Sequence, residues 1–273
     1  MEDHFVSLND VLFQFGPVVA VFSLLALVTK RAALLDALRR CRREAITNVL
    51  LFAFNTLLIG PIFIVPALVL SETLGDYGLF PQLWQRLPEG LTLLLALVLI
   101  DFVAYWRHRV EHMQGIWRFH ATHHADTAIH FLSVQRKHPV GKIISLLFDT
   151  LLVLALGFPA WAIAGAGILR SWWGYFIHAD VNWTLGGFGE VLMSPAAHRL
   201  HHIRDEKLMG TNYGNTITLW DKLFGTYLNP KPYLGCETGI EEGTRGFLGE
   251  LARPWEKRYR DGGTDVVEAE AKA

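Results

Sequence analysis

Charged residues are scarce in this chain. Only 19% of its 273 residues are Asp, Glu, Lys or Arg, whereas hydrophobic residues make up 51% and the mean hydropathy is +0.26. A soluble domain typically carries about 25% charged residues. The low charge and the long apolar runs therefore indicate an integral membrane protein with one compact polar region, rather than two soluble domains.

Cysteine and surplus positive charge are also scarce. Cys41 and Cys236 lie far apart and form no CxxC pair, so neither a disulfide framework nor a thiolate metal site is expected. The net charge of −1 leaves no basic surplus for binding nucleic acid. The first ten residues lack the basic region and the small-residue cleavage site of a signal peptide, so we expect no removable leader.

Long apolar runs dominate the first half of the sequence. Val11–Thr29, Ile46–Ser71 and Leu91–Trp106 are each close to the ~20 residues needed to cross a bilayer. The stretch Lys30–Glu44 holds six Lys or Arg residues, which places it on the cytoplasmic side, and Glu72–Gly90 then forms a polar loop on the far side. The third run returns the chain to the cytoplasmic face.

The apolar segment Ile143–Leu169 is about one span long, but Gly157 and Pro159 lie at its centre and signal a turn. A single crossing would separate the histidines before it from those after it. We therefore expect a hairpin that enters the membrane and returns, either as a re-entrant loop or as two short spans.

Histidine is concentrated in one region. Eleven of the twelve histidines fall between residues 108 and 202, with His4 the exception. Helical spacing of i, i+3 and i+4 would place each cluster on one face. The clusters are one HxxxH (His108, His112) and two HxxHH motifs (His120, His123, His124 and His198, His201, His202). Asp101 and Tyr105 continue the stripe of the first cluster, where they can orient the ligands.

Imidazole binds iron, zinc, copper and nickel, and eight clustered histidines exceed the three or four of a zinc site. With His138 and His178 added, the set suffices for two metal ions. A histidine-rich metal transporter is the competing class, although the first two apolar runs contain almost none of the polar residues that transport requires. The sequence HRVEH also matches the HxxEH motif of zinc metallopeptidases. That enzyme would leave the other clusters unused, so we expect Glu111 to be a solvent-facing partner of Arg107 or Arg109.

Six segments resemble the fatty acid hydroxylase/sterol desaturase superfamily in identity and order. They are DFVAYWRHRVEH, WRFHATHH, RKHP, FIHADV, MSPAAHRLHH and NYGNTITLWDKLFGTY, between Leu91 and Tyr227. The resemblance implies a membrane-embedded non-haem enzyme with two iron ions that uses O2 and two electrons. It implies ten metal ligands: His108, His112, His120, His123, His124, His138, His178, His198, His201 and His202. His130 matches no ligand of the family, and Asp180 stands where many members have Asn.

These observations predict an all-α integral membrane protein, a transmembrane helical bundle with a cytoplasmic histidine-rich di-metal cap. We expect N-terminal membrane helices in residues 1–90, a di-iron catalytic region in 91–230 and a polar C-terminal segment in 231–273 with a disordered tail. Asp101, Tyr105, Asp205 and Asn212 are candidate supporting residues of the catalytic site.

The expected activity is hydroxylation or desaturation of a lipid: fatty acyl, sterol-like or ether lipid. The chain contains neither a cytochrome b5 haem signature nor a GxGxxG loop, so a separate donor, cytochrome b5-like or a ferredoxin with its reductase, would supply electrons. The expected location is a bacterial inner membrane.

Overall fold

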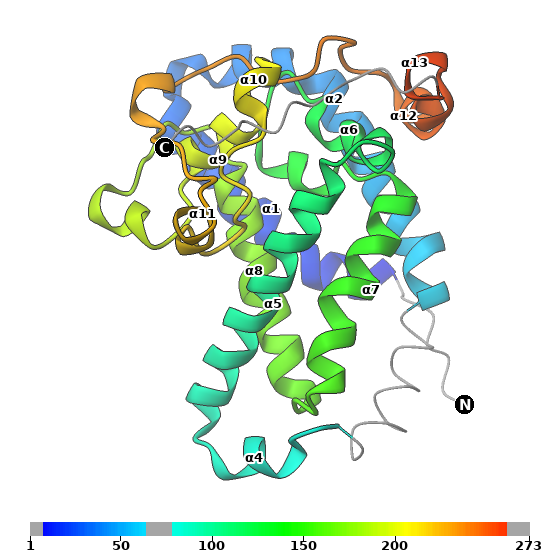
Figure 1. Cartoon of the computed structure of the whole chain (residues 1–273). Coiled ribbons are helices and arrows are strands. Elements are labelled where there is room, and N and C mark those ends of the chain that lie inside the picture. The colour runs from blue at the N-terminus through cyan, green and yellow to red at the C-terminus, as the bar shows by residue number, and fades with distance from the viewer. Residues whose placement is uncertain (1–7, 64–77, 261–273) are drawn as a thin grey trace.

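The computed structural model describes residues 8–63 and 78–260. These residues form helices joined by turns and loops, with two isolated β-bridges and no strand within the described ranges. The predicted all-α class is therefore confirmed. Figure 1 shows a narrow lower body of long helices and a broader upper part, the cap, built from short helices and loops.

The first two helices are separated by a sharp turn. Helix α1 spans Leu8–Lys30, the 3-10 turn η1 spans Arg31–Ala33, and α2 spans Leu34–Phe54. Arg31 has a φ of 46°, which redirects the chain so that α2 runs across the upper end of the molecule (Figure 1). The basic stretch Lys30–Glu44 thus lies mostly in the first part of α2.

Helix α2 continues through a π-helical turn, η2 (Asn55–Ile59). The second predicted span ends beyond the described residues, which stop at 63. Its described part does not consist of apolar contacts alone, because the polar residues Thr47, Asn48 and Asn55 are buried against the rest of the protein. Asn48 Nδ2 donates to Asp126 at 2.9 Å, and Asn55 Nδ2 donates to Lys137 O at 2.9 Å.

Helix α5 is the axis of the lower body. It spans Glu89–Glu111 and is preceded by the short α4 (Pro81–Arg86). The third predicted span is confirmed as a helix, and it continues five residues past Trp106, so that His108 also lies on it. Helices α7 (Pro139–Ala155) and α8 (Ala160–Ile177) pack against α5 on either side of their connecting turn.

The turn between α7 and α8 confirms that this segment folds as a helical hairpin. Gly157 adopts a φ of 74°, and Pro159 stands directly before the first residue of α8. The tip reaches the level of α4, since Leu79 N donates to Ala155 O at 2.9 Å and Trp84 Nε1 donates to Leu156 O at 2.7 Å. Helices of 17 and 18 residues are each about 25 Å long. The hairpin therefore descends beside α5 to the level of α4 and returns.

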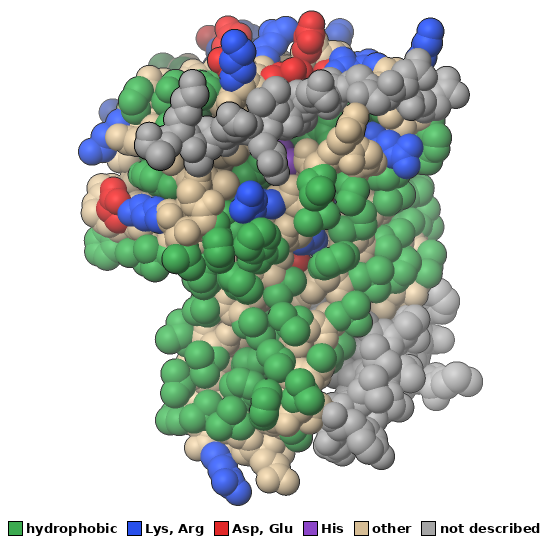
Figure 2. All heavy atoms as spheres, viewed as in Figure 1, with side chains coloured by type: hydrophobic (Ala, Val, Ile, Leu, Met, Phe, Trp, Pro, Cys, Tyr) green, Lys and Arg blue, Asp and Glu red, His purple; other side chains and the backbone are tan. Residues whose placement is uncertain are grey.

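The lower body is apolar on its outside. Figure 2 shows hydrophobic side chains covering it, while charged side chains gather on the upper end. The helical stretch Phe15–Phe63 and helix α5 are long and apolar enough to cross a membrane. Exposed side chains on α5, α7 and α8 include Leu94, Phe148, Leu151 and Ile168. Such a continuous exposed apolar surface is typical of a membrane-facing region.

Short elements build the cap above α5. They are α6 (Trp117–His124), η4 (Phe131–Gln135), η5 (Gly186–Glu190), α9 (Pro195–His201), α10 (Glu206–Met209), α11 (Leu219–Leu223), η6 (Lys231–Tyr233), α12 (Phe247–Ala252), η7 (Arg253–Trp255) and α13 (Lys257–Arg260). The segment 231–260 folds back onto the cap, with Glu250 and Arg253 fully buried. The predicted disordered tail lies outside the described residues.

The hairpin turn yields a test of the fold. A Cβ on Gly157 would lie 3.2 Å from Gly78 Cα and from Pro81 N, in a backbone conformation that disfavours side chains. We expect Gly157→Ala to lower the free energy of unfolding by about 1–2 kcal/mol or more. Gly167→Ala on α8 is the matched control, because open space surrounds that position. Thermal unfolding of both variants in detergent checks this, and equal midpoints would contradict the turn geometry.

Candidate metal centre

Nine buried histidines form two adjacent groups in the cap. The five-histidine group comprises His108, His112, His120, His124 and His201, and the four-histidine group comprises His123, His178, His198 and His202. Within each group, one ring nitrogen from every residue lies within 4.8 Å of the others. Among the described residues, these are the groups of histidine, cysteine and carboxylate side chains close enough to share a metal ion.

Helix ends deliver these histidines. His108 and His112 lie at the upper end of α5, and His178 ends α8. Short helices supply the rest: α6 carries three, and α9, which begins with Pro195 and is capped by the Ser194 hydroxyl, carries the others. The hairpin α7–α8 returns the chain to the cap, so that His178 meets His123, which lies 55 positions earlier in the chain.

Each HxxHH motif divides between the two groups. His120 and His124 of α6 join the five-histidine group, whereas His123 joins the other. Successive residues turn by about 100°, so His123 lies about 60° from His120 on the side away from His124. In the second motif, His201 joins the five-histidine group and its two neighbours join the other. Each short helix therefore lies between two adjoining sites and contributes to both.

Backbone carbonyls fix the orientation of four of the rings. The Nδ1 atoms of His108 and His201 lie 2.8 Å from Tyr213 O and 2.7 Å from Thr211 O. The Nδ1 atom of His178 lies 2.7 Å from Gly174 O, and that of His123 lies 3.3 Å from Arg136 O. A carbonyl oxygen only accepts hydrogen bonds, so each Nδ1 carries the proton. In the neutral ring, Nε2 then presents a lone pair.

These lone pairs face one another. His108 Nε2 and His201 Nε2 are 3.0 Å apart, and His178 Nε2 and His123 Nε2 are 3.4 Å apart. Two acceptors at such distances repel unless an electrophile lies between them. Both ring nitrogens of His112, His124 and His202 are buried without a hydrogen-bond partner in the described chain. Buried polar atoms without partners are unfavourable. A metal cation in each group satisfies both sets of nitrogens, so the residues fit a two-metal centre.

Burial keeps these rings neutral. It lowers the pKa of His201 to about 4, and it holds the pKa values of His124 and His202 well below 6.5, with neighbouring imidazoles adding to the shift. At neutral pH the rings are therefore unprotonated at one nitrogen, which is the form that binds metal. The positive charge of Lys137 further lowers the pKa of His120 and His123, after burial and the neighbouring histidines.

We predicted that Glu111 faces solvent, but its side chain is buried. It is 4% exposed, and both its oxygens accept hydrogen bonds from Arg107 Nη1 at 2.8–2.9 Å. The partner Arg107 is thus confirmed, but the exposure is wrong. One Glu111 oxygen also lies 3.3 Å from His120 Nδ1, so this carboxylate orients a ring of the five-histidine group. A glutamate engaged in this way is not a free general base, which weakens the metallopeptidase reading.

Asp101 and Tyr105 support the site indirectly. Asp101 accepts hydrogen bonds from Thr216 N and Ile217 N at 3.0 Å and from Trp220 Nε1 at 3.2 Å. These bonds fasten the segment 216–220 to α5. The Tyr105 hydroxyl bonds to Thr226, which in turn donates to Asp221.

Asp221 is a supporting residue that the sequence interpretation missed. It is fully buried and accepts from Tyr213 N at 2.6 Å and from Gly214 N at 2.9 Å. The same Tyr213 presents its carbonyl to His108. Asp221 therefore positions His108 through the backbone of Tyr213. Its place in the family-like segment NYGNTITLWDKLFGTY was the available signal.

Asp205 and Asn212 contact none of the histidines. Asp205 is exposed and caps α10 by accepting from Lys207 N at 3.0 Å. Asn212 is fully buried with a φ of 54°. Its side chain donates to Ala197 O and Leu228 O and accepts from Leu228 N, so it fastens α9 to the following loop.

His138 lies outside both groups, although the resemblance implied a ligand. Its Nδ1 accepts from Val140 N at 3.2 Å as the N-cap of α7, and its Nε2 lies 3.2 Å from Leu251 O. Both nitrogens thus have partners before any metal binds. His130 also lies outside the groups, with Ser133 and Ala128 O as its hydrogen-bond partners.

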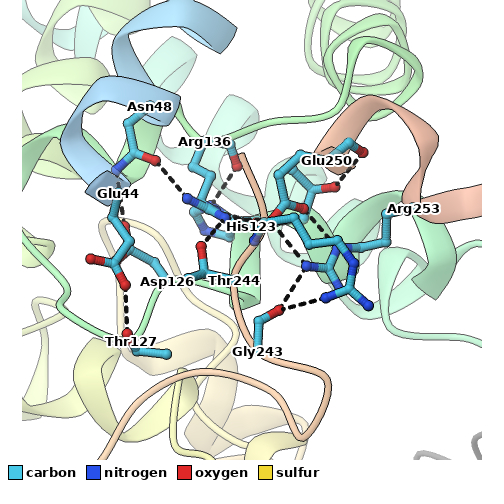
Figure 3. Close-up of polar contacts among 12 residues, drawn as sticks. Glu44, Asn48, His123, Asp126, Thr127, Arg136, Gly243, Thr244, Glu250 and Arg253 are labelled. Carbon is cyan, nitrogen blue, oxygen red and sulfur yellow. Dashed lines mark hydrogen bonds and ion pairs between the residues drawn. The ribbon is translucent and has the colours of Figure 1, made fainter. Parts of the chain in front are cut away.

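Arg136 joins the site to distant parts of the chain (Figure 3). Its guanidinium is fully buried and donates to Thr122 O at 2.8 Å, to Asn48 at 3.1 Å, to Thr244 at 2.6 Å and to Glu250. The residue thereby links α2, α6 and the C-terminal segment, and its carbonyl holds His123. Glu250 is paired in turn with Arg253 at 2.6 Å.

Comparison with known proteins points to one family. Residues 93–226 match the family model described as fatty acid hydroxylase. The chain is 29% identical to ornithine lipid hydroxylase OlsE of Rhizobium tropici over 183 residues, which cover 66% of this chain and 54% of the relative. Human alkylglycerol monooxygenase is 30% identical over 154 residues, covering 56% of this chain and 33% of the relative.

Rat lathosterol oxidase is 27% identical over 169 residues, which cover 60% of this chain and 54% of the relative. No solved structure matches the chain. The chain spans about half the length of the first of these curated relatives. The matched region contains every histidine of the two groups, and all six segments fall within or beside it, so residues 93–226 are similar to the fatty acid hydroxylase family.

Proposed function

We propose that this protein is a membrane-embedded oxidoreductase that hydroxylates or desaturates a lipid at a di-iron centre held by the nine histidines. The observation that carries the proposal is the pair of buried, neutral histidine groups with Nε2 lone pairs facing one another. The names of the relatives, which include a lipid hydroxylase, a monooxygenase and a sterol oxidase, agree with this reaction class.

Iron suits this donor set, because imidazole nitrogens bind it while leaving positions open for other ligands. When bound, the two ions supply the O2-dependent oxidation of a lipid C–H bond, with electrons from a separate donor protein. The nine histidines hold the metal, and the carbonyls of Tyr213, Thr211, Gly174 and Arg136 keep four of the rings in the tautomer that binds metal through Nε2. Burial of the rings excludes water from the reaction.

The proposed topology places the cap in the cytoplasm. The stretch Lys30–Glu44, with its six basic residues, lies at the upper end beside the cap, whereas α4 lies at the opposite end. Short loops rich in Lys and Arg remain on the cytoplasmic side. Helices α5, α7 and α8 would then cross the membrane, and the host membrane would be a bacterial inner membrane.

Activity is tested by lipid extraction from cells that express the chain with iron. Mass spectrometry should show lipids that have gained an oxygen atom or lost two hydrogens, and 18O2 should label the hydroxylated products. His123→Ala cells should show neither change. Products that form equally in both strains would contradict the proposal.

The ligand set is tested by elemental analysis. The wild-type protein should retain about two iron ions, and loss of a bond from the metal should lower affinity at least as much as loss of a supporting partner, about 10–100-fold. His123→Ala should therefore lose iron. His130→Ala and His138→Ala should both retain it, since both residues lie outside the two groups. Loss of iron in His138→Ala would restore that residue to the ligand set.

Asp221 and Asp205 offer a matched pair of variants to test whether residues that hold the Tyr213 backbone affect metal binding. Asp221→Ala removes the acceptor that positions Tyr213, so the metal affinity of the five-histidine group should fall about 10-fold or more. Asp205→Ala removes an exposed helix cap and should leave the metal affinity unchanged. Iron retention during chelator titration measures both. Equal retention would show that Asp221 does not act on the site.

Topology is tested by thiol labelling of intact cells. Cys41 lies near the start of α2 and Cys236 lies in the cap, so a membrane-impermeant maleimide added outside should label neither. Gln85→Cys, exposed on α4 at the opposite end, is the positive control and should label. Labelling of Cys236 but not of Gln85→Cys would invert the proposed orientation.

A further inference from the structure

A cavity of about 580 Å³ lies between α1, the end of α2, η2, η4, α7 and α8. Its apolar wall includes Phe15, Phe52, Ile168 and Trp172. This volume falls within the range of about 300–1,000 Å³ that is usual for small-molecule sites. Phe13 and Ile168 on its rim are 84% and 59% exposed, so it opens on the apolar, membrane-facing side of the protein.

The inner end of the cavity adjoins the four-histidine group through two elements. Lys137 and Gln135, which line the cavity, flank Arg136, whose carbonyl holds His123. Tyr175, which also lines it, follows Gly174, whose carbonyl holds His178. Tyr175 and Gln135 are hydrogen-bonded to each other across the inner wall. A molecule in this cavity therefore lies one residue layer from two of the metal ligands.

Two lysines supply positive charge to this otherwise apolar space. Lys137 and Lys142 both line the cavity, and neither has a carboxylate within 4.0 Å in the described chain. The nearest carboxylates, Glu111 and Asp149, are already ion-paired with Arg107.

The charges of this region do not balance. The cations Arg107, Arg170, Lys137 and Lys142 number four, and the carboxylates Asp101, Glu111 and Asp149 number three. Charged groups taken out of water are stable mainly when they are paired. An anion in the cavity would supply the missing partner.

We propose that this cavity binds a lipid with an anionic head, a carboxylate or a phosphate, whose oxygens contact Lys137 and Lys142 while its acyl chain lies along Phe15, Phe52 and Trp172. The assignment rests on the proposed function for its role as the substrate site. The binding itself does not require metal, so it is tested separately.

The test uses the metal-free full chain in detergent and a fluorescent polyene fatty acid, parinaric acid, with its methyl ester as the neutral control. The wild-type protein should bind the acid more tightly than the ester, because charged hydrogen bonds are the strong ones. Lys137→Met and Lys142→Met should each weaken acid binding about tenfold and leave ester binding unchanged. Lys231→Met, an exposed lysine outside this cavity, should change neither.

A second variant guards against misfolding. Ser171 is exposed on α8 and lines the cavity, so Ser171→Trp fills space without disturbing the core and should weaken the binding of acid and ester alike. Equal binding of acid and ester by the wild-type protein, or unchanged binding in Ser171→Trp, would overturn the proposal. Competition with stearate and with lysophosphatidate distinguishes a carboxylate from a phosphate head, and failure of both to compete would also overturn it.

Iron content separates this proposal from the broader one. Normal iron and lipid oxidation together with an unchanged acid preference in Lys137→Met and Lys142→Met would refute the anionic subsite alone. A chain that retains no iron but binds the acid through the two lysines would refute the di-iron function alone.

Discussion

The hydrogen bond from Nδ1 of a buried histidine to a backbone carbonyl is the interaction on which this structure depends. It recurs at His108, His123, His178 and His201, and it directs the lone pair of each ring towards the centre of a group. A neutral imidazole could otherwise place its proton on either nitrogen. The bonds therefore set the chemistry of the site before any metal arrives, at the cost of placing like acceptors 3.0–3.4 Å apart.

Much of the remaining polar network holds those carbonyls in place. The loop after α10 presents Thr211 O and Tyr213 O, and it is fastened by Asn212, Asp221 and Asp101 to three different elements. Fully buried carboxylates that accept several N–H groups lower the cost of their own burial. Residues 203–226 include no histidine, yet the ring orientations of His108 and His201 depend on this loop.

Helical periodicity explains how much of the site was predictable. A long apolar run predicted α5, Gly157 and Pro159 predicted the hairpin turn, and helical spacing grouped the eight clustered histidines, because these features depend on neighbours in sequence. Helical spacing did not show that His123 and His201 each join a different group from the other two histidines of their motif. That division depends on where two separate helices meet.

Contacts between residues far apart in the chain have no local signal in the sequence. His138 precedes a proline and resembles a family ligand, but in the structure it caps α7 and bonds to Leu251 O. Glu111 follows a charged helix end and looked exposed, but Arg107 and His120 surround it. Arg136 and Glu250 are 114 residues apart, and no local pattern joins them.

The bond between Arg136 and Glu250 has a consequence for the order of assembly. Before Glu250 has been synthesised, the Arg136 guanidinium, which contacts α6 at Thr122 O, lacks its carboxylate partner. A buried charge without its partner is strongly unfavourable. Domains generally fold as the chain emerges, from the N-terminal side onward. The histidines of α6 therefore reach their final packing only when the C-terminal segment arrives. The C-terminal segment includes none of the nine histidines, yet it completes the packing of α6. A chain that ended before Glu250 would leave α6 without this support.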